Sequence, residues 1–218
     1  VQGRALANYS IGFNEANTYD IRPVYFTGKD QFGNSGHIPS AAMQTIIDRA
    51  INRWQNILRR SAFSPVTAAI PEDSCSSRYH TPAFSGTIRG LMIFTQVVDS
   101  FPRPDTTNIT LANAAPCRFR AGNSAPYMAF MNIGKDMQSL AETGSLTNIE
   151  YVEDLVVHEI GHTLGIANDL SGSWHYKVNM SSPSAPYFTG VTAIIRFNDL
   201  FPNFTGVRVP VDPGSLSH

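Results

Sequence analysis

Residues 147–166 read TNIEYVEDLVVHEIGHTLGI, and the spacing of His158, Glu159 and His162 constrains this chain more than any other feature. On a helix, residues four apart lie on one face about one turn apart, so His158 and His162 project their imidazoles toward one point. Two neutral imidazoles and a third ligand hold Zn²⁺ tetrahedrally and leave one position for water. The carboxylate of Glu159 is within reach of that water and can act as a general base. The stretch therefore predicts a zinc metallopeptidase.

The surrounding residues predict the helix that carries this motif. Thr147 and Glu150 have the spacing of a capping box, which starts a helix about three turns before His158. Gly165 suits the left-handed residue that ends a helix. An apolar stripe at helical spacing runs along Val152, Val156, Ile160 and Leu164. A buried helix whose histidines only satisfy hydrogen bonds is the alternative, but it explains neither the glutamate nor the glycine.

Length and charge limit the classes of protein. A chain of 218 residues forms one large domain or two small lobes and can bury a sizeable core. The net charge is −1 with no basic or acidic block, so we expect neither nucleic acid nor an anionic membrane surface as a partner. No apolar run approaches the roughly 18 residues that cross a bilayer, so no transmembrane segment is expected. We expect a monomer.

Cys75 and Cys117 are the only cysteines. We expect one disulfide between them, across a loop-rich part of the chain; two unrelated buried thiols are the alternative. The chain begins at Val1 without an initiator methionine or a signal peptide, so we expect a mature or trimmed form. The missing leader is therefore no evidence for a cytosolic location.

The rest of the chain predicts an α/β fold. Residues 18–27 form a strand, with Pro23 at an edge or a bulge. A helix over about 41–60, capped by Ser40, has an apolar stripe made of Met43, Ile46, Ile47, Ala50, Ile51, Trp54, Ile57 and Leu58. The elements that follow are a loop over 61–84, a buried strand over 86–98, a long connection, a strand over 127–133 and a short helix over 136–144. The zinc helix is expected to pack beneath the sheet.

Two subdomains are predicted. Residues 1–166 form an N-terminal catalytic subdomain with the zinc helix, and residues 167–218 form a C-terminal subdomain that supplies the third ligand. Within the second subdomain we expect a helix in 188–201 and an extended tail. We expect an extended protein or peptide substrate to bind along the strand at 127–133, as the edge of the sheet.

Four residues beyond Gly165 are candidates for the third ligand. Asn168 and Asp169 lie three and four residues past the glycine. A carboxylate oxygen binds zinc well and an amide oxygen binds it poorly, so spacing alone favours Asp169. His175 stands in a polar loop, and His218 is far away in the sequence.

A family resemblance changes the order of preference among these four candidates for the third ligand. HEIGHTLGI resembles the metzincin helix, and the text around it resembles the leishmanolysin family, particularly its short bacterial-type members. The similar stretches are GLMIFTQVVDS, RAGNSAPYMAFMNIGKDM, LTNIEYVEDLVVHEIGHTLGI, YFTGVTAIIRFNDL and VPVDPGSLSH. The resemblance implies a twisted mixed sheet with a long backing helix, an active-site helix and a small, mostly irregular C-terminal lobe. It implies a secreted or cell-surface zinc endopeptidase with His158, His162 and His218 as ligands and Glu159 as base.

The chain departs from that family at its end. It stops at His218, whereas the family continues into a tight turn that carries a methionine beneath the metal. Either the C-terminal subdomain is truncated, or His218 is a tail residue and Met180 supplies the methionine turn. The residues after the zinc helix also differ from the family, so Asp169 and Asn168 stay open as ligands.

The remaining candidates have ordinary alternatives. Asp154 lies one turn before His158 and either orients an imidazole or is a solvated helix carboxylate. His37 and His80 are expected to be surface histidines. The alternative function, from a different class, is a binding or adhesion module that keeps the metallopeptidase fold without turnover.

Overall fold

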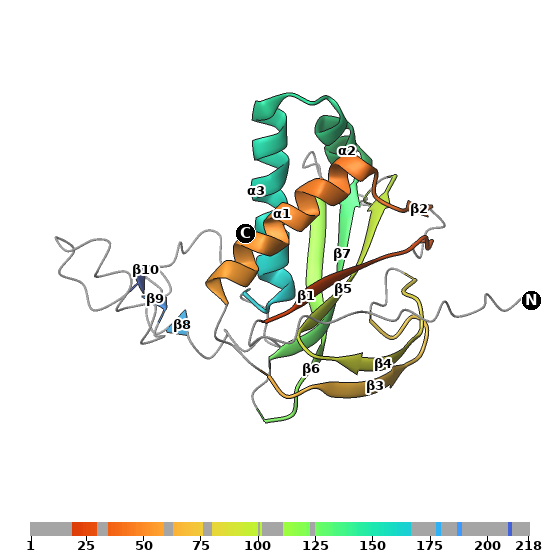
Figure 1. Cartoon of the computed structure of the whole chain (residues 1–218), viewed down its shortest axis with the longest axis vertical. Coiled ribbons are helices and arrows are strands. Elements are labelled where there is room, and N and C mark those ends of the chain that lie inside the picture. Colours follow the sequence, from red (N-terminus) through yellow and green to blue (C-terminus); the bar gives the residue numbers. More distant parts are fainter. Residues whose placement is uncertain are drawn as a thin grey trace, which may run out of the picture. The chain divides into compact units, whose positions relative to one another are not determined.

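A five-stranded mixed sheet forms the centre of the larger part of the molecule (Figure 1). Its strands are β1 (Ile21–Tyr25), β2 (Gly36–His37), β5 (Leu91–Val98), β6 (Ala112–Phe119) and β7 (Pro126–Gly134). The computed structural model describes residues 19–29, 35–58, 63–75, 80–99, 101, 111–122 and 125–166, together with three two-residue strands at 178–179, 187–188 and 209–210.

The strand order is β1-β5-β7-β6, and β2 pairs with one end of β5. β1 and β7 run parallel to β5, whereas β6 runs antiparallel to β7 and β2 antiparallel to β5. Every residue of β5 is buried, as its continuous apolar sequence predicts for a central strand. The predicted α/β fold with a twisted mixed sheet is therefore confirmed, and it is consistent with a metzincin-like fold.

The edge of the sheet was predicted wrongly. The strand predicted at 127–133 is β7, which lies between β5 and β6, so its backbone groups already pair on both sides. Among the described strands, β6 lies at the edge next to β7, and it falls in the stretch predicted as a long connection. Its sequence, ANAAPCRF, has no alternation of apolar and polar residues, and Pro116 argues against a strand. Pairing with β7 overrides this local signal, with a register shift after Pro116.

A hairpin of β3 (Val66–Ile70) and β4 (Phe84–Ile88) covers one face of the sheet. The loop predicted at 61–84 therefore contains a strand, and the single strand predicted at 86–98 is two strands separated by Arg89 and Gly90. A side chain at Gly90 would overlap the backbone of Asp20, the residue before β1, so this close approach requires glycine. The hairpin and the sheet share one apolar cluster, which contains Val24, Phe26, Ile70, Cys75, Ile88, Met92, Phe94 and Met128.

Cys75 and Cys117 form the predicted disulfide. Cys75 follows β3, and Cys117 lies in β6 at the register shift. The bridge therefore ties the edge strand of the sheet to the hairpin that covers one face.

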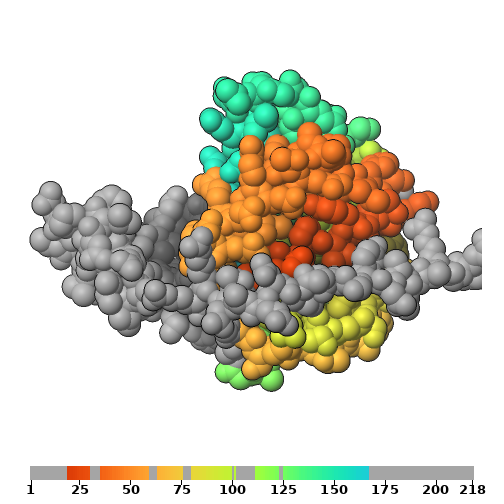
Figure 2. Space-filling model, viewed as in Figure 1, coloured from red at the N-terminus to blue at the C-terminus, as the bar shows by residue number. Residues whose placement is uncertain are grey.

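Three helices pack on one another: α1 (Ala41–Ile57), α2 (Lys135–Glu142) and α3 (Leu146–Thr163). α2 and α3 also contact strands of the sheet. Ser40 caps α1 as predicted, because its hydroxyl accepts a hydrogen bond from the backbone of Met43. Five residues of the predicted stripe are buried, but Ile57, at the end of α1, is 72% exposed and is not part of the core. In Figure 2, α1 (orange) lies at the surface, next to the green and teal surface of α2 and the first turns of α3.

The helix α3, which carries the predicted zinc motif, contacts α1, α2, β6 and β7. Its predicted stripe, Val152, Val156, Ile160 and Leu164, is buried. The helix begins after Ser145, not at a capping box made by Thr147 and Glu150. The predicted glycine end is confirmed, since Gly165 has a φ of 85°.

The chain divides into two compact units, one made of 1–121 and 126–164 and the other of 122–125 and 165–218. The described part of the second unit is a small antiparallel sheet of β8 (Val178–Asn179), β9 (Tyr187–Phe188) and β10 (Val209–Pro210). The helix predicted in 188–201 lies outside the described residues, except for Phe188 in β9. No helix among the described residues is long and apolar enough to cross a membrane.

Candidate metal centre

Two imidazoles of α3 converge, as the motif predicts. The Nε2 atoms of His158 and His162 lie 2.9 Å apart, and the two rings are almost perpendicular, with centroids 4.5 Å apart. Zinc–nitrogen bonds of about 2.0–2.1 Å in tetrahedral geometry separate two ligand nitrogens by about 3.3 Å. The rings therefore need to part by only a few tenths of an ångström to bind one ion between them.

Glu159 is the buried carboxylate of this site. The residue is 5% exposed, and its Oε2 atom has no hydrogen-bond partner among the described residues. Burial raises the pKa of this carboxyl to about 7. An unsatisfied buried carboxylate oxygen needs a partner, because leaving it without one costs free energy. The two imidazoles and this orphaned oxygen thus fit a cation and its water.

All the predicted candidates for a third ligand lie outside the part of the chain that the structure describes. Asn168, Asp169, His175 and His218 all lie there, and so does Met180. Within the described ranges, no group of three histidines, cysteines or acidic residues is placed to hold a metal ion. The choice among the four candidates therefore stays a prediction.

Asp154 lies one turn before His158, but its carboxylate pairs with Arg53 of α1 at 2.8 Å and its side chain is 72% exposed. This is the solvated helix carboxylate that the sequence offered as the ordinary alternative. His37 and His80 are exposed, as expected for surface histidines. Their imidazoles contact the carboxylates of Asp99 and Asp73.

Trp54 is the residue near the motif that sequence reasoning did not single out. The pattern assigns it to the apolar stripe of α1, and its indole does lie partly buried. Its Nε1–H also donates a hydrogen bond of 2.8 Å to the carbonyl of Val157, the residue before His158. Helical spacing within α1 carries no signal of this contact, because the acceptor is on another helix.

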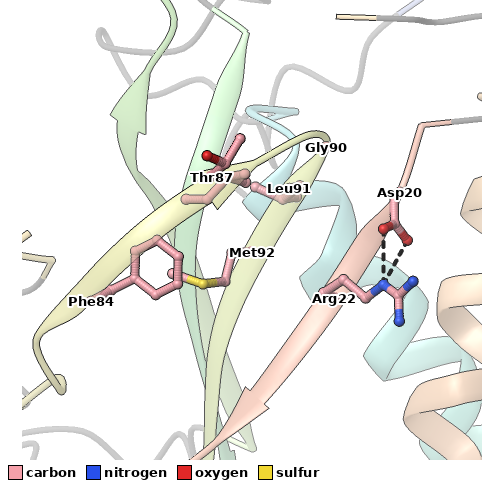
Figure 3. A pocket seen from close by; sticks show the side chains of 8 residues that line it. Asp20, Arg22, Phe84, Thr87, Gly90, Leu91 and Met92 are labelled. Carbon is pink, nitrogen blue, oxygen red and sulfur yellow. Dashed lines mark hydrogen bonds and ion pairs between the residues drawn. The ribbon is translucent and has the colours of Figure 1, made fainter. Parts of the chain in front are cut away.

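A small pocket lies elsewhere in the molecule, between β1, β4 and β5 (Figure 3). One side holds the ion pair of Asp20 and Arg22, and the others are formed by Phe84, Thr87, Ile88, Gly90, Leu91 and Met92. The pocket has room for about one water molecule, so it cannot bind a substrate.

A helix that carries two converging imidazoles and an adjacent buried carboxylate is the arrangement that a zinc metallopeptidase motif requires. Residues 145–195, which include all of α3, match the profile of a family described as Met-zincin. No curated protein matches the sequence. The family match supports the metzincin clan, zinc binding and a metallopeptidase type of function, but it does not extend to the leishmanolysin-like subfamily.

Proposed function

We propose that this protein is a zinc-dependent endopeptidase that hydrolyses peptide bonds of protein substrates, with Glu159 as its general base. The observation that carries the proposal is the convergence of the two Nε2 atoms next to a buried carboxylate on the same helix. We further propose that the enzyme is leishmanolysin-like, on the sequence resemblance over the stretches quoted above.

His158 and His162 would hold the ion through their Nε2 atoms, so each ring would keep its proton on Nδ1. We propose His218 as the third ligand, with Asp169 as the alternative. When bound, zinc lowers the pKa of its water toward ~7 and polarises the scissile carbonyl.

Glu159 acts on protons in this mechanism. Its carboxylate accepts the proton of the attacking water and then delivers it to the nitrogen of the leaving amine. The burial of this side chain supports the role, because a carboxyl shielded from solvent keeps the proton it accepts for the leaving group.

We propose that the substrate binds in an extended conformation along β6. Among the described strands, β6 pairs with β7 alone, so its other side is an edge that offers backbone groups. Pro116 lacks an N–H and a register shift follows it. Regular pairing with a substrate would therefore use the first half of the strand, Ala112–Ala115.

The disulfide supports a protein that works outside the reducing cytosol, because such bonds persist in oxidising compartments. We propose that the enzyme is secreted or displayed at the cell surface.

Replacing Glu159 by glutamine tests the proposal. Glu159→Gln should keep zinc at one equivalent and lower the cleavage of casein or a fluorogenic peptide by about 10²–10⁴-fold, the usual contribution of a general base. His158→Ala should lose the metal, as elemental analysis would show. Normal turnover by Glu159→Gln removes this residue from the mechanism. Stoichiometric zinc without any cleavage by the wild type would instead favour the binding or adhesion module.

A further inference from the structure

Helix α1 holds α3 at the turn that carries the metal motif. The indole Nε1–H of Trp54 donates to the carbonyl of Val157 at 2.8 Å. The edge of the same indole lies against Gly161: the Cζ2 atom is 3.3 Å from the position that a Cβ would occupy there. Val157 and Gly161 are four residues apart and lie on one face, so Trp54 contacts two successive turns of α3.

These two contact points bracket the motif. Val157 directly precedes His158, and Gly161 directly precedes His162. A rotation or a slide of α3 therefore cannot move the imidazoles without also moving the two points that Trp54 holds. Metal sites need their ligands within about 0.5 Å and 10–20° of the productive geometry. A single hydrogen bond plus a close ring contact at this turn restricts both movements.

The other polar contacts between the two helices are weaker restraints. Arg49 pairs with Glu153 at 2.8 Å, and Arg53 pairs with Asp154 at the same distance. The side chains of both arginines are about half exposed, and solvent screens ion pairs of this kind. The carboxylates of these pairs, on Glu153 and Asp154, lie five and four residues before His158, and the arginine side chains that reach them are long and flexible. They hold the helices together without fixing the direction of an imidazole.

The absence of a side chain at Gly161 makes room for the indole of Trp54. Within the motif, position 161 is not a ligand and could carry many side chains. Here a Cβ at 3.3 Å from the ring carbon would force the indole to move, because such a contact is shorter than ordinary van der Waals separation. Glycine at this position lets α1 approach α3 closely enough for the indole to reach the carbonyl of Val157.

We propose that Trp54 is a positioning residue of the metal centre, which sets the rotation and the axial position of α3 so that the imidazoles of His158 and His162 meet at one ion. The proposal rests on the proposed zinc binding by these two histidines. It assigns to α1 a role in metal affinity in addition to its role in the core.

Trp54→Phe tests the proposal, because phenylalanine keeps an aromatic ring and removes the N–H donor. We expect the zinc affinity, measured by competition with a chromogenic chelator, to fall about 10-fold or more, as for other groups that orient metal ligands. The visible absorption spectrum of the Co²⁺-loaded protein should change, since it reports the geometry of the ligands. Gly161→Ala should shift both measurements in the same direction.

Ile47→Val is the matched control. Ile47 is a fully buried residue of α1 that makes no polar contact with the motif, so its truncation lowers stability without freeing α3 to rotate. All variants are compared at a temperature at which circular dichroism shows them folded. Unchanged zinc affinity and an unchanged Co²⁺ spectrum in Trp54→Phe would overturn the proposal, and so would equal losses in Trp54→Phe and Ile47→Val. A wild type that binds no zinc at all would instead refute the proposed function on which it rests.

Discussion

At the scale of single residues, the buried guanidinium of Arg120 connects backbone segments at one end of the sheet. Arg120 is 6% exposed, and its guanidinium donates to the backbone carbonyls of Pro126 and Gly90 at 2.7 Å each. It lies over the rings of Phe63 and Tyr127. Burial lowers the pKa of this guanidinium. The charge-assisted bonds connect the start of β7 with the residue before β5.

Tyr19 donates to the same carbonyl of Pro126 as Arg120, and its burial leads us to expect a loss of stability in alkali. Its hydroxyl donates to the carbonyl of Pro126 at 3.2 Å, and burial raises its pKa from 10.0 to about 12, against the opposing charge of Arg120. The folded protein keeps the phenol protonated where the unfolded chain ionises. The contribution of this phenol to the free energy of unfolding is therefore fully present below pH 10. It falls by about 2–3 kcal/mol as the pH rises toward 12.

Urea unfolding from about pH 8 to about pH 11 measures this effect. Tyr19→Phe should be less stable at the lower pH, because the hydrogen bond is gone, but its stability should fall less steeply in alkali. Tyr25, whose pKa burial also raises, is present in both proteins and cancels in the comparison. Parallel curves for the two proteins would show that the phenol of Tyr19 does not titrate with folding.

Among the elements, β6 is the one whose local sequence argues most against its structure. It contains Pro116, small residues and a register shift, and β7 is its only partner among the described strands. Two features compensate. The disulfide fixes Cys117 to Cys75, and α3 packs against the strand. The strand proposed to bind substrate is therefore held in place by elements far away in the sequence.

Removing the disulfide should destabilise the protein. The bridge joins residues that are 42 positions apart, and closing a loop of this size contributes about 4 kcal/mol in a chain-entropy account. The double variant Cys75→Ser, Cys117→Ser should lose about that much free energy of unfolding, measured with denaturant. The wild type treated with a reductant should match it. If reduction leaves the stability unchanged, the bridge does not restrain the unfolded chain.

The helices and the strands β1, β5 and β7 were predictable, whereas β3 and β6 were not. The stripes of α1 and α3 repeat at helical spacing, and β5 is apolar throughout, so each carries its own signal. β3 and β6 lack such a pattern. Their strands form because a neighbour offers backbone groups and an apolar surface, which local periodicity does not record.

At the scale of the whole molecule, the proposed metal centre needs a third ligand from outside α3. α3 carries the two proposed ligands, and the family match extends past the helix to residue 195. The candidates are either close behind the helix, at Asp169, or at the far end, at His218. If His218 is the third ligand, zinc binding requires the last residues of the chain. If Asp169 is the third ligand, it does not.

Truncation separates the choices. A chain that ends at residue 205 should lose its zinc if His218 is a ligand, as elemental analysis after dialysis would show. His218→Ala in the full chain should lose it as well, while Asp169→Ala should keep it. Full zinc occupancy in the truncated protein would exclude His218 and favour Asp169.

The sequence by itself determined where the chemistry lies: on a helix, a four-residue spacing is enough to bring two imidazoles together beside a carboxylate, because the backbone geometry turns spacing into direction. Only the tertiary structure decided what surrounds them. Contacts between segments that are distant in the chain place β6 at an edge and pack the hairpin of β3 and β4 against the sheet. A contact of the same kind is the hydrogen bond from Trp54 to the carbonyl of Val157. No local pattern encodes such contacts, since each is stabilised by the partner it meets after folding.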